Sequence, residues 1–134
     1  MNRSLTGMSP AFEWNPPASD DAIREGEREY GGPLPPDYVE LLRTYDGGST
    51  PGNLSILGVE DCVQRNVDYE VGLYLPGYFM IGDDGGGNAI VLGLRDRRVY
   101  EVDMGVMDES HLRPSASSLA ELVELGTSLI EREP

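Results

Sequence analysis

Cysteine and histidine each occur once in this chain, as Cys62 and His111, so they form the only possible cysteine–histidine catalytic pair. Cys62 shares a helical spacing with Val59 and Val63, where a lone cysteine is usually a small buried hydrophobe. His111 follows Asp108 and Glu109, which favour its charged form. The chain also lacks a Gly-x-Ser-x-Gly motif. We therefore expect no catalytic residue.

The acidic, glycine-rich segment 83–88 is the next candidate for chemistry. It lacks the spaced oxygen ligands and the closing glutamate of a calcium loop. Its carboxylates would repel a phosphate group. Three consecutive glycines permit the positive φ angles of a tight hairpin. We predict a turn between two strands, and no metal or cofactor site. The single cysteine also excludes an internal disulfide and a cysteine-cluster metal site.

Lysine is absent, and all ten basic residues are arginine. A Walker phosphate loop and Schiff-base chemistry, including pyridoxal-phosphate attachment, both need a lysine and are therefore excluded. Carboxylates are abundant, so residue types alone leave glycosidase chemistry open. A chain of 134 residues nevertheless has little room for a sugar cleft, and no aromatic cluster marks one.

The chain is strongly acidic, with 24 acidic and 10 basic residues and a net charge of −14. This charge repels nucleic-acid phosphates and attracts basic proteins, whose encounter it accelerates. The alternative is that the charge only keeps the protein soluble. No apolar run is long enough to span a membrane, and the first ten residues lack the apolar centre of a signal peptide. We expect a cytoplasmic protein with no membrane or nucleic-acid partner.

Two helices are predicted in the first third of the chain, after an extended lead-in over residues 1–18 whose aromatic residues pack onto the body. Ser19 is a suitable N-cap for a helix that ends near Tyr30, before two glycines. The second helix runs over 34–46, begins at prolines and ends at Asp46-Gly47-Gly48. Its apolar stripe has the i, i+3, i+4, i+7 spacing and consists of Tyr38, Leu41, Leu42 and Tyr45.

Short strands separated by tight turns dominate the next part of the chain. The expected strands are 54–57, 78–81, 89–94 and 98–104. One or two helical turns are expected over 59–66, a loop over 71–78 and an irregular segment over 105–117. A capping-box pattern at Ser118 starts a final helix that reaches Ile130 and is weakened at Gly126. The pattern predicts a single α+β domain over 19–134, with an antiparallel meander packed by N-terminal helices and a C-terminal helix.

Three of these motifs together resemble the SUKH superfamily, the domains similar to the yeast Smi/Knr cell-wall assembly regulator. The first is Leu34-Pro35, Tyr38, Leu41-Leu42 and Tyr45-Asp46-Gly47-Gly48. The second is the strand, turn, strand, turn, strand block YFMIGDDGGGNAIVLGLRDRRVYEVD, and the third is the closing SASSLAELVEL. The resemblance covers about residues 20–130. The family's usual aromatic residue near the start of the last helix is here Leu119.

The resemblance implies an α+β fold and no enzymatic activity. Most bacterial members of the superfamily are thought to be immunity proteins that bind and neutralise a cognate toxin, often a nuclease. The resemblance therefore implies a partner that is a toxin or another basic protein. A regulatory scaffold that binds a cellular protein is the alternative, and a small hydrolase is the third candidate.

An acidic binding face would fit either binding function. We expect it beside the predicted meander, where the carboxylates would stand in for substrate phosphates on a basic partner. The expected residues are Glu60, Asp61, Asp68, Glu70, Asp83 and Asp84.

Overall fold

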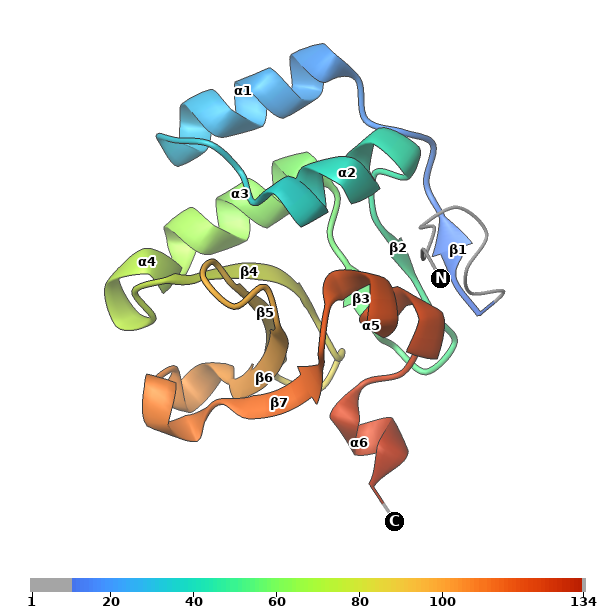
Figure 1. The fold of residues 1–134 in the computed structure, drawn as a ribbon, viewed down its shortest axis with the longest axis vertical. Helices are drawn as coiled ribbons and strands as arrows, with labels where there is room; N and C mark the ends of the chain where they lie inside the picture. Colours follow the sequence, from blue (N-terminus) through green and yellow to red (C-terminus); the bar gives the residue numbers. More distant parts are fainter. Residues whose placement is uncertain (1–10, 134) are drawn as a thin grey trace.

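An antiparallel sheet of seven strands forms the centre of the molecule, and each strand pairs with the next one in sequence. The structure is a computed structural model that describes residues 11–133. The predicted α+β class and meander are confirmed (Figure 1). The strands are β1 (Glu13–Trp14), β2 (Gly48–Ser49), β3 (Ser55–Ile56), β4 (Tyr78–Asp83), β5 (Asn88–Gly93), β6 (Val99–Asp103) and β7 (Arg113–Ala116).

The helices lie in three groups around this sheet (Figure 1). Those of the first half gather at one end of the molecule: α1 (Asp20–Tyr30), α2 (Pro36–Thr44) and α3 (Val59–Asp68). The short α4 (Val71–Tyr74) follows α3, and α5 (Leu119–Leu125) and α6 (Leu129–Arg132) come last. Two 3₁₀ turns, η1 (Met104–Val106) and η2 (Glu109–His111), precede β7. No helix within residues 11–133 combines the length and the apolar character that crossing a membrane requires.

The first helix begins and ends at the predicted signals and the second begins at the predicted prolines, but α2 ends at Thr44, before the predicted Asp46-Gly47-Gly48, because Tyr45 adopts an extended conformation. The Ser19 hydroxyl accepts a hydrogen bond from the Ala22 backbone N–H at 3.0 Å, and Gly31 ends α1 in the left-handed conformation. Prolines start α2, in which Tyr38, Leu41 and Leu42 are fully buried.

The central strands bury both of their faces, because residues alternate between two apolar clusters. Phe79, Ile81, Ile90 and Leu92 point into the main core, which contains the buried faces of α1, α2, α3 and α5. Their neighbours point the other way, into a second core with Val71 and Leu75. The partly buried side chains that complete this second core are Tyr78, Tyr100, Met104, Met107 and Leu112. Because both faces are buried, the sequences of these strands are continuous apolar runs and do not alternate between apolar and polar residues.

A side chain of α3 covers the edge of β4 that β3 is too short to pair. The Asn66 amide donates a hydrogen bond to the Met80 carbonyl at 2.8 Å and accepts one from the Met80 N–H at 2.8 Å. Met80 is fully buried, so without the Asn66 amide its backbone N–H and carbonyl groups could not bond to water instead. This amide fixes α3 to the sheet and prevents pairing with another strand at that position.

Three predictions about the second half of the chain are wrong. The segment 71–78 contains α4 and is not only a loop, and 105–117 contains β7, η2 and most of η1. The predicted single helix after Ser118 is two helices, because Gly126 adopts φ 66° and ends α5. Such short elements are stabilised mainly by tertiary contacts, which cannot be predicted from local sequence patterns.

The second of these two helices is attached to a buried carboxylate. Glu101 on β6 is fully buried, and its Oε2 accepts hydrogen bonds from the Ser115 hydroxyl and from the Leu129 N–H, at 2.7 and 2.8 Å. Arg132 of α6 lies 3.9 Å from the same oxygen. These contacts attach the start and the end of α6 to the sheet.

Candidate functional site

Cys62 and His111 lie on different faces of the sheet, so they do not form a catalytic pair. Cys62 is fully buried in the main core, and its thiol donates to the Met80 carbonyl at 3.0 Å. Burial raises the pKa of the Cys62 thiol to about 12. His111 lies in η2 beside the second core, with its Nδ1 3.5 Å from the Asp108 carboxylate. Among residues 11–133, no three His, Cys, Asp or Glu side chains group as metal ligands would.

The 83–88 segment forms the predicted turn, and the Asp84 carboxylate holds it together. Asp84 is 5% exposed. Its Oδ1 accepts hydrogen bonds from the N–H groups of Gly86 and Asn88, and its Oδ2 accepts one from the Asn88 amide. Burial alone would raise the pKa of Asp84, but these hydrogen bonds stabilise the carboxylate and lower the pKa below its usual value. The geometry gives Asp84 a structural role.

Asp83 is compensated by a neighbouring arginine. Its Oδ2 lies 3.2 Å from the Arg65 guanidinium of α3, and its Oδ1 accepts a hydrogen bond from the Gly85 N–H. The Asp83 side chain is 18% exposed. Asp83 and Arg65 together present little net charge to a partner.

The other four acidic residues expected at a binding face are exposed. They are distributed along α3 and the short link between α3 and α4. Glu60 and Asp61 occupy the first helical turn, and Asp68 the last. Glu70 follows at the start of α4. The side chains of Glu60, Asp61 and Glu70 have no hydrogen-bond or ion-pair partner within residues 11–133, whereas Asp68 accepts a hydrogen bond from Gln64 at 2.7 Å.

A groove of about 400 Å³ between α1 and α3 adds acidic residues that the sequence analysis did not select. Its rim carries Glu25 and Glu29 from α1 and Glu60 from α3. Its apolar lining is Ala22, Gly26 and Val59. We call this hollow the α1–α3 groove.

The groove depends on close contact between the two helices at Gly26. A Cβ atom at that position would lie 2.6 Å from a Val59 methyl group. Any larger residue would therefore push α1 away from α3.

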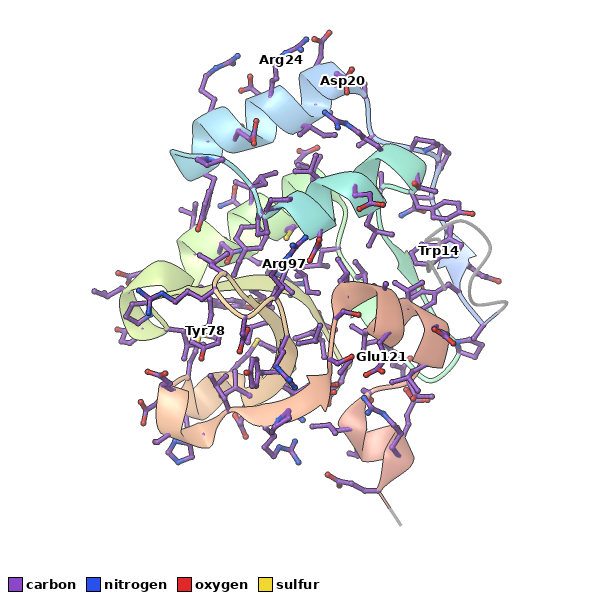
Figure 2. The ribbon with its side chains drawn as sticks, in the orientation of Figure 1. Trp14, Asp20, Arg24, Tyr78, Arg97 and Glu121 are labelled. Atoms are coloured by element: carbon purple, nitrogen blue, oxygen red, sulfur yellow. The ribbon has the colours of Figure 1, made fainter. Side chains whose placement is uncertain are left out.

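The charges on α1 explain why Glu29 remains uncompensated. Arg24 pairs with Asp21 and Arg28 pairs with Glu25, both on the exposed surface of the same helix. Figure 2 shows Arg24 and Asp20 on the outer side of α1. Glu29 has no hydrogen-bond or ion-pair partner among the described residues, so its charge faces solvent beside that of Glu60. Residue spacing within each helix cannot show this arrangement, because it depends on how the helices pack.

The basic turn after β5 is also partly compensated. Arg97 forms a two-point contact with the Asp37 carboxylate of α2, with its Nε 3.0 Å from Oδ2. Figure 2 shows Arg97 between the β5–β6 turn and α2. This ion pair fixes the turn to the helix layer and leaves Arg95 and Arg98 as its exposed charges.

Comparison with known proteins agrees with this fold. The sequence model of the SMI1 / KNR4 family (SUKH-1) matches residues 17–125, from the residues before α1 to the end of α5. Comparison with curated proteins gives no match. The family match covers most of the chain and confirms the resemblance seen in the sequence. The chain belongs to the SMI1 / KNR4 family (SUKH-1).

Proposed function

We propose that this protein is an immunity protein, which binds a basic toxin domain in the cytoplasm and blocks its active surface. Domains of its family are commonly immunity proteins and are generally non-catalytic binding domains. The proposed binding face consists of the α1–α3 groove and the exposed side of α3. Its acidic residues are Glu25, Glu29, Glu60, Asp61 and Asp68.

The observation that carries this proposal is the group of uncompensated carboxylates at Glu29, Glu60 and Asp61. None of these three has a hydrogen-bond or ion-pair partner within residues 11–133, although most arginines of that range have one. A carboxylate with no internal partner contributes little to folding but is free to bind an arginine or lysine of another protein. Charge complementarity of this kind accelerates association and discriminates against acidic partners.

The proposed mechanism is occlusion and includes no chemical step. A nuclease binds substrate phosphates with basic side chains. Carboxylates of the binding face would take the place of those phosphates, and the apolar lining of the groove would pack against the aliphatic stems of the bound arginines and lysines. Asp83 and Asp84 are left out of the proposed face, because their carboxylates are largely buried as well as hydrogen-bonded within this protein, whereas Glu25 and Asp68 are exposed.

Charge reversal at the groove tests the proposal. The partner to assay is the protein encoded by the adjacent gene, purified as an inactive variant, with association measured by surface-binding kinetics. Glu29→Arg with Glu60→Arg should slow association at least about tenfold. The matched control is Glu40→Arg with Glu133→Arg, which changes the net charge equally at exposed positions on α2 and after α6.

The two pairs of variants distinguish the effect of where a charge is reversed from the effect of the change in total charge. Equal losses from both pairs would contradict a binding face at the groove. An absence of binding would contradict the proposed function for that partner. Binding without protection of cells that produce the active partner would favour the regulatory scaffold.

A further inference from the structure

Exposed apolar side chains gather where α3 meets α4. Of the large hydrophobic residues exposed within 11–133, Val67, Tyr69, Leu73 and Tyr74 fall in one stretch of eight residues. Leu73 is 66% exposed and Tyr74 is 57% exposed. Tyr69 and Tyr74 line a hollow of about 200 Å³ with Met104, Gly105 and Met107. We call Tyr69, Leu73, Tyr74, Met104 and Met107 the α3–α4 corner.

The fold does not account for these exposed side chains. The α4 helix is held by Val71 and Leu75, which are fully buried in the second core. Leu73 and Tyr74 do not belong to that buried cluster, and more than half of each residue is exposed. Exposed apolar side chains that gather in one region mark interaction sites in soluble proteins. Tyrosine is also enriched among the residues that dominate binding energies.

The backbone of the corner is fixed before any partner arrives. Glu70 adopts φ 50°, which is uncommon for a residue with a side chain, and its carbonyl accepts hydrogen bonds from the N–H groups of Leu73 and Tyr74 at 2.9 and 3.1 Å. Figure 1 shows α4 on the same side of the molecule, at the left of the view, as the segment that follows β6. A rigid apolar site loses little conformational entropy on binding.

The charges around the corner identify the kind of partner. Residues 67–74 and 103–109 contain five acidic residues and no arginine: Asp68, Glu70, Asp103, Asp108 and Glu109. A second copy of this chain would bring like charges together, and anionic lipids and nucleic acids would be repelled. A protein with an apolar spot ringed by arginine or lysine fits both features, since apolar centres with polar rims are the usual anatomy of interfaces.

We propose that the α3–α4 corner is the apolar anchor of the interface with a basic protein partner. This inference rests on the proposed function and adds the residues that hold the complex together. The α3 helix joins the groove to the corner over about 15 Å, at 1.5 Å per residue. An interface of common size, about 800 Å² on each side, would cover both.

Removal of the apolar side chains tests the anchor. The partner is again the inactive protein encoded by the adjacent gene. Leu73→Ser with Tyr74→Ser should raise the Kd about 30-fold or more, mainly by faster dissociation. The control is Leu125→Ser with Ile130→Ser, since these residues are 43% and 60% exposed on α5 and α6. Thermal unfolding checks that each variant folds. If the double variant does not fold, the binding of Leu73→Ser alone is measured instead.

The outcomes distinguish a failure of the anchor from a failure of the proposed function. A selective loss at the corner supports the anchor. Binding that is unchanged by the corner variant, or weakened equally by the control, overturns the anchor and leaves the acidic groove as the proposed site. No binding by the unmodified protein overturns both proposals for this partner. Sedimentation that shows a dimer dissociated by the corner variant would identify a second copy as the occupant and also overturn the proposal.

Discussion

At the scale of single residues, the environment of Cys62 determines its reactivity. The thiol lies in the main core beside Tyr38 and donates its hydrogen to the Met80 carbonyl. Because the thiolate is the nucleophilic form, a pKa raised to about 12 by burial leaves almost none of it at neutral pH.

We predict that Cys62 is inert in the folded protein. A thiol reagent such as Ellman's reagent should give no fast reaction at pH 8, and should react with one thiol per chain after unfolding in guanidinium. The Cys62→Ala variant should still bind a partner. Rapid reaction in buffer alone would contradict the buried position.

The Asp84 carboxylate should make stability depend on pH. Its folded-state pKa is lowered, so the unfolded state binds the proton more tightly. The stabilisation is complete above the unfolded value, about 3.9, and is lost as the pH falls through the lower folded value. Asp84→Asn should reduce the free energy of unfolding at pH 7 and flatten its dependence below pH 4.

Urea titrations at several pH values would measure this difference. Asp61→Asn is the matched control, because the Asp61 carboxylate has no hydrogen-bond or ion-pair partner within the described range. It should leave the free energy of unfolding at pH 7 nearly unchanged. Parallel curves for the two variants would contradict a structural role for Asp84.

At the scale of elements, Gly126 separates two helices that the sequence predicted as one. Its φ of 66° lets the chain leave α5 and begin α6 after Ser128. Gly126→Ala should destabilise the protein by about 1–2 kcal/mol, the cost of a left-handed conformation for a residue with a Cβ. Gly72→Ala is a suitable control, since α4 leaves open space at that position and alanine favours helix. Denaturant midpoints of both variants would check the difference.

Elements with local signals were predictable, and elements without them were not. Ser19, Pro36 and Gly31 mark the ends of α1 and α2 within the sequence itself. In contrast, α4 and β7 have four residues each. The first depends on Val71 and Leu75 reaching the second core, and the second on pairing with β6. Such contacts join residues that are distant in sequence.

The same distinction applies to the proposed site. Glu60 and Asp61 were selected because acidic residues cluster along that part of the chain. Glu29 belongs beside them only because α1 packs on α3 through Gly26, which no spacing within one helix reveals. Asp84 was selected on charge alone, and its hydrogen bonds could not be inferred from composition.

At the scale of the whole molecule, the charge of −14 should act through encounter rates. The Debye length falls from about 30 Å at 0.01 M salt to about 8 Å at 0.15 M, so long-range attraction is screened over this range. We predict that the association rate with a basic partner falls steeply with salt while the dissociation rate changes much less. Stopped-flow measurements across this range would check it. An association rate that does not depend on salt would assign the acidity to solubility alone.

The strand order has a consequence for synthesis on the ribosome. Each strand pairs with the one made just before it, so the sheet can grow in the direction of translation. The main core, however, also needs Leu119, Leu122 and Val123 of α5. A nascent chain that has exposed β6 but not yet α5 therefore presents an unfinished apolar face around Phe79 and Leu92. We expect ribosome-associated chaperones to bind this intermediate and to release it once residue 123 has left the exit tunnel.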